Sequence, residues 1–203
     1  GTIDVAVPAE RGNVARVAVD WSQTATGSPP LIAPHMIPFQ YTSPALASGE
    51  WYLHVRVMDP GGQWSAARHF GPYRIDRTPP TSPVFTGGPT LGSYTTTSMT
   101  PYTVSATDTE SGVSGYTSIC VPQGSVNQPS TLPAQASKTT TITCPAFNAD
   151  GLWVVKARAF DTTGNSSTVT TSAPFMVDIA PPTATLTSTS HQINVAATNT
   201  TIT

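Results

Sequence analysis

Hydrophobic and polar residues alternate in two stretches of the chain, 51–58 and 153–160. Every odd-numbered residue is Trp, Leu or Val in the first stretch and Trp, Val or Ala in the second. A period of two predicts a β-strand that turns one face toward a core. Each stretch is followed by a turn, Asp59–Gln63 or Asp161–Asn165, in which Asp accepts backbone hydrogen bonds and Gly allows a positive φ. A further strand follows each turn, so both stretches predict a β-hairpin.

The two predicted hairpins are copies of one another. Residues 49–80 align with residues 151–182 at a constant offset of 102, without a gap, and ten of the 32 aligned pairs are identical. The identical pairs are Gly49/Gly151, Trp51/Trp153, Arg56/Arg158, Asp59/Asp161, Gly62/Gly164, Ser65/Ser167, Pro72/Pro174, Asp76/Asp178, Pro79/Pro181 and Pro80/Pro182. This agreement exceeds what the composition gives by chance, and it indicates two copies of one structural unit.

Each copy ends at a double proline, Pro79-Pro80 or Pro181-Pro182. Proline has no N–H to donate to a β-ladder, so no strand continues through these pairs, and they favour a short, stiff linker. We therefore predict an all-β protein of tandem antiparallel β-sandwich domains, one over 1–78 and a second over 79–180. A Thr-rich strand segment, 181–203, either begins a further module or docks as an added strand on another chain.

The repeated hairpin also resembles a known class of module. Gly49–Ser65 followed by Tyr73–Pro80 is similar to the C-terminal hairpin of bacterial Ig-like and fibronectin III-like surface modules, which commonly read G-x-W/Y-x-hydrophobic-x-V-x-A-x-D-x-A-G-N-x-S and then F-x-V-D-x-T-x-P-P. Ala106–Tyr116 resembles their earlier D-x-x-S-G-V segment, and Val17–Trp21 resembles the V-x-V-x-W of a fibronectin III second strand. The resemblance implies a β-sandwich but leaves the function open, because such modules serve as spacers, adhesive heads and enzyme accessories.

Charge and hydropathy narrow the possible partners. Charged residues make up 10% of the chain, its formal net charge is −2, and Lys and Arg form no cluster. A nucleic-acid partner would require a basic stripe, so we predict none. No apolar run approaches the roughly 20 residues of a membrane-spanning helix, so no membrane span is predicted. A weakly charged surface rich in Thr and Ser is typical of an exposed extracellular fibre, and we expect an extracellular or cell-surface protein.

Cys120 and Cys144 are the two cysteines of the chain. They could be two buried thiols, a disulfide or half of a metal site. No CxxC motif or Cys/His ligand set lies near them, which argues against zinc. We predict a disulfide, which would stabilise the second domain by about 3 kcal/mol in the chain-entropy model.

Four acidic residues are candidates for a calcium site near the junction of the modules: Asp108, Glu110, Asp161 and Asp178. Calcium requires several oxygen ligands, which carboxylates supply. The alternative is that Asp161 caps its turn and Asp178 ends a strand. No stretch has the dense Asp/Asn/Gly spacing of a dedicated calcium loop, so we predict no required cofactor and keep calcium as the candidate metal.

Several aromatic residues are candidates for ligand binding. Trp21, Trp51 and Trp153 fall in phase with predicted core residues, whereas Trp64 has Ser166 as its counterpart in the second copy. Trp64 is either a residue packed on its own hairpin or a sugar-stacking aromatic. A carbohydrate-binding surface would need exposed aromatics in a row, and the candidates are Trp64, Tyr94, Tyr102 and Tyr116.

Two sequons, Asn165-Ser-Ser and Asn199-Thr-Thr, are candidate glycosylation sites.

No pattern in the chain predicts catalysis. The four histidines are scattered, and the alternation places His54 and Lys156 on the outward faces of their strands. No nucleophile elbow, HExxH, P-loop or Rossmann fingerprint occurs. We therefore predict that the chain is not an enzyme.

These observations favour a structural or adhesive module of a secreted or cell-surface protein. Its partners would be neighbouring modules or like subunits, with a glycan or a cell-surface protein as a further possibility. Strand addition by residues 183–203 would make the chain a subunit of an extracellular filament. The alternative function is a carbohydrate-binding accessory domain of a secreted enzyme.

Overall fold

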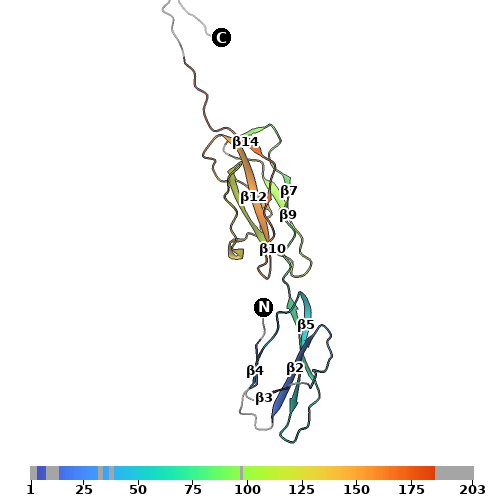
Figure 1. The fold of residues 1–203 in the computed structure, drawn as a ribbon. Coiled ribbons are helices and arrows are strands. Elements are labelled where there is room, and N and C mark those ends of the chain that lie inside the picture. The colour runs from blue at the N-terminus through green and yellow to red at the C-terminus, as the bar shows by residue number, and fades with distance from the viewer. Residues whose placement is uncertain (1–3, 8–13, 32–33, 37–38, 97, 186–203) are drawn as a thin grey trace, which may run out of the picture.

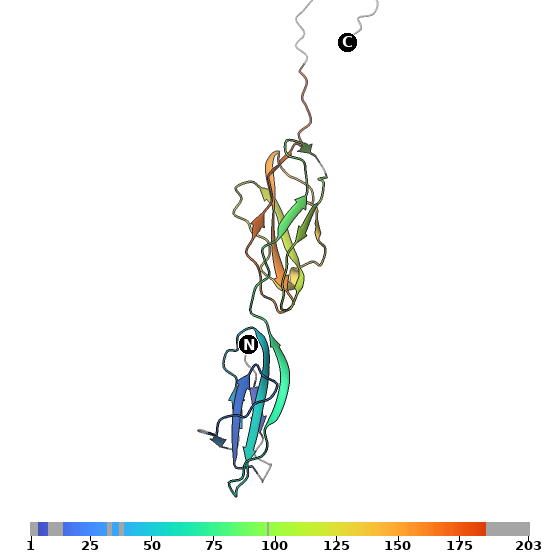
Figure 2. The same cartoon turned by 90° about the vertical axis from the view of Figure 1, so that its right-hand side faces the viewer.

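The computed structural model describes residues 4–7, 14–31, 34–36, 39–96 and 98–185. Within these ranges the regular structure is β-strand, apart from one 3-10 turn at Pro133–Gln135. The strands form two groups that share no β-ladder, and Figures 1 and 2 show the two groups end to end in an elongated molecule. We call them the N-terminal unit, residues 4–75, and the C-terminal unit, residues 84–177.

The N-terminal unit contains two antiparallel sheets. A two-stranded sheet pairs β1 (Asp4–Val7) with β4 (Phe39–Thr42). A four-stranded sheet has the order β3 (His35–Met36), β2 (Arg16–Ser22), β5 (Gly49–Met58) and β6 (Arg68–Ile75). The predicted hairpin is β5 with β6.

The C-terminal unit also contains two sheets. One has the order β11 (Thr141–Ile142), β9 (Tyr102–Ser105) and β7 (Val84–Gly87). The other has the order β10 (Val113–Pro122), β12 (Gly151–Asp161), β14 (Phe175–Val177) and β8 (Tyr94–Thr95), with β13 (Thr170–Thr171) also paired to β12. All of these pairings are antiparallel except that between β14 and β8. The fold is therefore an all-β arrangement of antiparallel β-sandwich sheets, as the sequence predicts.

The two units have cores of different size. The buried cluster of the C-terminal unit has twelve members, among them Trp153, Phe147 and Phe175, which meet edge to face. Among the residues whose side chains the structure describes, the buried cluster of the N-terminal unit has three members, Trp21, Leu46 and Leu53, with partly buried neighbours around them.

The repeat identifies the counterpart of β2 in the C-terminal unit. Val17–Trp21 lies in β2, which pairs with β5 of the hairpin, and Ala18 lies opposite Arg56. In the C-terminal unit the equivalent residue is Arg158, which lies opposite Thr117 of β10. The strand that precedes β10 in the chain, β9 (Tyr102–Ser105), lies in the other sheet. Thus β2 corresponds to β10, and the alternation alone could not tell which sheet it would join.

The described part of the C-terminal segment leaves the C-terminal unit as an exposed chain (Figure 1). Thr183–Thr185 are exposed and belong to no strand. The remainder of the predicted strand segment, together with Asn199, lies outside the described residues. No helix in the described ranges is long and apolar enough to cross a membrane.

Candidate junction site

The turns of the two hairpins have the same hydrogen bonds. In the first, Asp59 Oδ1 accepts from the Gln63 N–H at 2.8 Å, and in the second, Asp161 Oδ1 accepts from the Asn165 N–H at 2.8 Å. The Asp59 N–H donates to the Gln63 carbonyl at 3.0 Å, and the Asp161 N–H donates to the Asn165 carbonyl at 3.1 Å. Both Asp residues therefore cap their turns, as the turn-capping alternative predicts.

The second turn also reaches the neighbouring unit. Thr163 Oγ1 and Asn165 Nδ2 donate to the backbone carbonyl of Asp76, at 3.3 and 3.2 Å. Asp76 follows directly after β6, so this carbonyl belongs to the chain as it leaves the N-terminal unit. The first turn has Gly61 and Gln63 at the equivalent positions. Only the second turn is therefore placed between the units.

Three carboxylates meet at this junction. Asp76, Asp108 and Asp161 each have a carboxylate oxygen within 4.8 Å of those of the other two. They come from three segments: the exit of β6, the loop before β10 and the end of β12. Carboxylates this close repel one another unless a cation or hydrogen-bond donors compensate their charge.

Local hydrogen bonds compensate two of the three carboxylates. Asp108 Oδ1 accepts from the N–H groups of Glu110, Ser111 and Gly112, at 3.2, 2.9 and 2.8 Å. Asp161 is only 1% exposed, and its Oδ2 accepts from Asn165 Nδ2 at 2.6 Å. These bonds fix the direction of both carboxylates toward the junction.

Asp76 is compensated less completely. Its Oδ1 accepts from the Thr78 N–H at 2.9 Å, whereas its Oδ2 is a buried atom without a hydrogen-bond partner. The Ser111 hydroxyl lies against this carboxylate and is the main cause that lowers the pKa of Asp76, although Ser111 Oγ also completes no hydrogen bond. The buried Asp76 Oδ2 thus keeps unused acceptor capacity beside the cluster.

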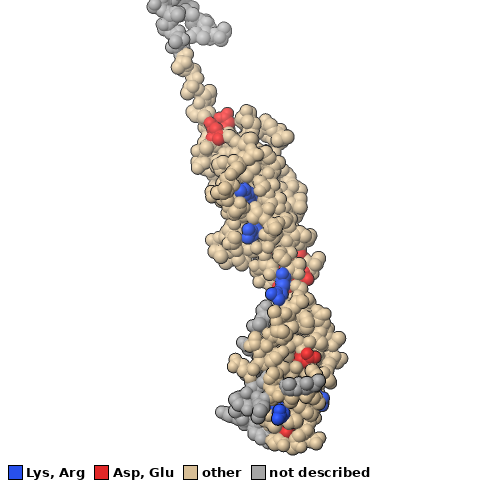
Figure 3. All heavy atoms as spheres, in the orientation of Figure 1, with Lys and Arg blue, Asp and Glu red and all other residues tan. Residues whose placement is uncertain are grey.

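A pocket of about 550 Å³ opens beside the cluster. Residues of both units line it, including Ile75 of the N-terminal unit and Glu110, Ser111 and Thr163 of the C-terminal unit, together with Asp76 directly after β6. At its N-terminal wall Arg74 Nε donates to Glu50 Oε1 at 2.9 Å, and both side chains are well exposed. Elsewhere charges are sparse on the visible surface, as Figure 3 shows.

The structure brings together two of the four predicted calcium candidates. Asp108 and Asp161 lie in the cluster, and Glu110 lines the adjacent pocket. Asp178 lies at the other end of the C-terminal unit, where its N–H donates to the Thr95 carbonyl, so it does not join the cluster. The third member is Asp76, the repeat counterpart of Asp178. The repeat could have pointed to Asp76, because the Asp that ends the first unit lies at its junction with the second unit.

The four aromatic candidates do not form a row. Tyr102 and Tyr116 are 4% and 8% exposed; the Tyr102 hydroxyl donates to the Ala173 carbonyl, and the Tyr116 hydroxyl accepts from the Ala106 N–H. Tyr94 is exposed on the C-terminal unit, while Trp64 belongs to the N-terminal unit and lies beneath the guanidinium of Arg56 at 6.0 Å. Tyr102 on β9 and Tyr116 on β10 are therefore core residues, and the stacking surface expected to include them is not present there.

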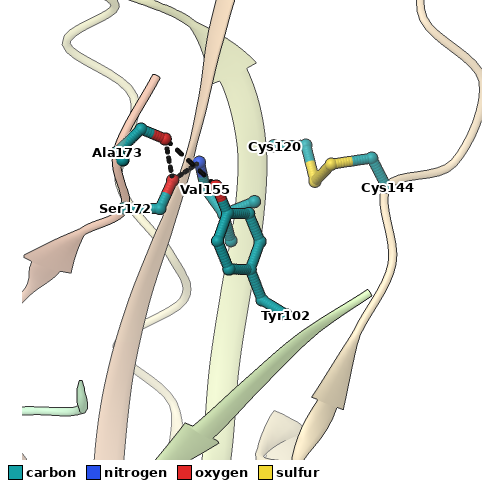
Figure 4. Close-up of a disulfide and its surroundings, with 6 residues drawn as sticks. All are labelled: Tyr102, Cys120, Cys144, Val155, Ser172 and Ala173. Carbon is teal, nitrogen blue, oxygen red and sulfur yellow. Dashed lines mark hydrogen bonds between the residues drawn. A yellow bond between two sulfur atoms is a disulfide. The ribbon is translucent and has the colours of Figure 1, made fainter. Parts of the chain in front are cut away.

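Cys120 and Cys144 form the predicted disulfide. Cys120 lies on β10, and Cys144 follows β11 of the other sheet, so the bond joins the two sheets of the C-terminal unit (Figure 4). Tyr102 and Val155 lie near it in the core, and the Val155 N–H donates to Ser172 Oγ at 2.9 Å (Figure 4).

Two residues predicted on outward strand faces are buried. His54 is 1% exposed and contacts His69 and Ser22. Lys156 is 9% exposed, and its Nζ donates to the carbonyls of Ser125 and Asn127 at 2.6 and 3.1 Å. Loops cover the outer face of each sheet here, which a strand period cannot reveal. The sequon residue Asn165 uses its side-chain amide in the junction, so a glycan there would replace these hydrogen bonds.

No protein-family model matches this chain, and no curated protein is similar to it in sequence. Among solved structures it is similar to the fibronectin(III)-like modules of Clostridium thermocellum CbhA, with 16% sequence identity and a TM-score of 0.40. The match covers 88% of this chain and 85% of that chain. The β-sandwich assignment rests on the ladders of the chain itself.

Proposed function

We propose that this chain is a structural spacer of an extracellular protein, in which the second unit is held at a fixed angle to the first. The observation that carries the proposal is the pair of hydrogen bonds from Thr163 and Asn165 to the Asp76 carbonyl. Ser82 and Thr168, whose hydroxyls lie 2.6 Å apart, add a contact between the linker and the C-terminal unit. A disulfide between sheets and a weakly charged surface suit an oxidising, extracellular setting.

The test measures whether the two units tumble together. Backbone ¹⁵N relaxation should give both units one rotational correlation time in the unaltered chain. The double variant Thr163→Ala/Asn165→Ala should give two shorter ones, because the turn then offers no donor to Asp76. Gln63→Ala is the matched control, since it alters the equivalent turn away from the junction. Independent tumbling in the unaltered chain would contradict the proposal.

We also propose that calcium binds at the junction and stiffens it. Three carboxylates converge there, and the buried Asp76 Oδ2 has no partner within the described residues. Asp76, Asp108 and Asp161 would be the ligands, and Ca²⁺ would supply the positive charge that their convergence lacks. The cation would join segments from both units.

Calorimetric titration with CaCl2, after removal of divalent ions with EDTA, tests this second proposal. Asp76→Asn should weaken binding at least tenfold, whereas the repeat counterpart Asp178→Asn should leave it unchanged because Asp178 lies at the far end of its unit. Equal binding by both variants, or no binding by the unaltered chain, would overturn the calcium proposal. The spacer proposal would still stand if the calcium-free units tumble together.

The filament form of the spacer would use strand addition. In the C-terminal unit β9 pairs with both β11 and β7, whereas its counterpart β1 pairs only with β4 among the described residues. Residues 183–203 follow the second double proline as the segment containing β7 follows the first. These residues would supply a second neighbour for β1 in another copy. Sedimentation velocity should find chains that end at Pro182 monomeric, and normal assembly of such chains would exclude this form.

The carbohydrate-binding alternative retains only Trp64 and Tyr94, which lie on different units, and no observation favours it.

A further inference from the structure

Two histidines contact each other directly on neighbouring strands of the N-terminal unit. His54 on β5 and His69 on β6 are register partners, and their Nδ1 atoms lie 2.7 Å apart. The rings meet edge to face at a centroid distance of 4.9 Å. His54 is 1% exposed, whereas His69 is exposed. The pair therefore joins the buried face of the central strand to the edge strand.

The other side of the His54 ring holds a loop. Its Nε2 lies 2.8 Å from Ser22 Oγ, which also contacts Thr24 Oγ1 at 2.9 Å. Gly27 lies directly over the ring, since a Cβ at this position would come within 3.1 Å of the His54 Cδ2 and Nε2 atoms. The nearby Pro29 is fully buried. One imidazole thus connects β6, β5 and the segment 22–29.

The short distance between the two Nδ1 atoms determines their protonation. Two nitrogens at 2.7 Å share one proton, so one ring donates and the other accepts. If both rings carry a charge, both Nδ1 atoms have a hydrogen, and the contact becomes repulsive. The pair is therefore compatible with at most one charged imidazole.

The charged side chains around the pair do not compensate a positive charge on the second imidazole. Asp20, on β2, is the register partner of His54 and the one acidic residue that acts on its pKa. Arg56 and Arg68, on β5 and β6, are cationic, and segment 22–29 contains no titratable side chain. Burial, and then the neighbouring His69, lower the pKa of His54, and Asp20 opposes them less strongly.

We propose that His54 and His69 form an acid-sensitive latch, which holds β6 and the segment 22–29 against β5 and opens when both imidazoles are protonated. In the open state His54 regains an ordinary pKa of about 6.5. The open state then binds more protons than the closed state once the pH falls below that value. Opening becomes steadily more favourable as the pH falls further, down to the lowered pKa of the closed state.

Hydrogen exchange measured by mass spectrometry on the full chain tests the latch. Between pH 7.5 and pH 5.0, after correction for intrinsic rates, exchange should rise by about tenfold or more in peptides that cover 22–29 and 68–70. The C-terminal unit is the internal control, because its described residues include no histidine. His69→Gln should reduce the acid response of these peptides, because the burial of His54 remains but its charged neighbour is lost, and His35→Gln should retain the full response.

Two results would overturn the latch: equal protection at both pH values, or an undiminished acid response in His69→Gln. If His69→Gln does not fold, the imidazole ¹H–¹³C signals of the unaltered chain decide instead. A latch requires His54 to titrate below the ordinary value of about 6.5, and titration of His54 at that ordinary value would exclude it.

Discussion

The two units share a hairpin but differ in what lies beneath it. Trp51 and Trp153 each donate from Nε1 to the carbonyl of an alanine four residues earlier, at 2.9 and 3.1 Å. Yet Trp153 is 6% exposed within the large cluster, whereas Trp51 remains partly exposed beside the small one. Local hydrogen bonds are copied with the repeat, while burial depends on segments outside it. Residue identity across a repeat therefore predicts backbone geometry better than it predicts stability.

The largest difference in stability between the two units is expected when Trp153→Ala is compared with Trp51→Ala. Both variants lose the same hydrogen bond, so the remaining difference comes from packing. We expect Trp153→Ala to destabilise the C-terminal unit by about 3–5 kcal/mol and Trp51→Ala to cost the N-terminal unit about half of that. Urea unfolding, followed by NMR signals of each unit, measures both. Equal losses would show that the two cores support the hairpin equally.

Removal of the disulfide should affect one unit only. Cys120→Ala with Cys144→Ala should lower the free energy of unfolding of the C-terminal unit by about 3 kcal/mol, because the loop is no longer closed in the unfolded chain. The urea midpoint of the N-terminal unit serves as the control and should not move. A shift of both midpoints would mean that the units unfold together.

A smaller difference is expected at the paired serines. Ser65 Oγ accepts from the Val57 N–H at 3.1 Å, and Ser167 Oγ accepts from the Ala159 N–H at 2.9 Å. Ser167 is 5% exposed, so Ser167→Ala should leave a buried donor unsatisfied and cost about 1–2 kcal/mol. Ser65→Ala should cost less, since water can replace the hydroxyl at this half-buried position. The same urea measurements compare the two.

The sequence predicts the hairpins, their turns and the disulfide because each depends on residues close in the chain or on a single pair. It does not predict the burial of His54 and Lys156, because loops that cover these strands come from segments without a period. The carboxylates at the junction were predicted only in part. Asp108 and Asp161 were foreseen as acids near it, whereas Asp76 required knowing which end of a unit meets the next. Such contacts follow from the direction of the linker, which alternation does not encode.

The disulfide has a consequence for the chain under load. Cys120 and Cys144 are 24 positions apart. When the two ends of the molecule are pulled apart, the loop that they close cannot straighten. At about 3.3–3.6 Å per residue, this withholds roughly 80 Å of contour length from the extended chain. The described part of the N-terminal unit contains no such crosslink, since both cysteines lie in the other unit. In a tether built from these two units, the N-terminal unit would extend fully under load, whereas the disulfide would limit the extension of the C-terminal unit.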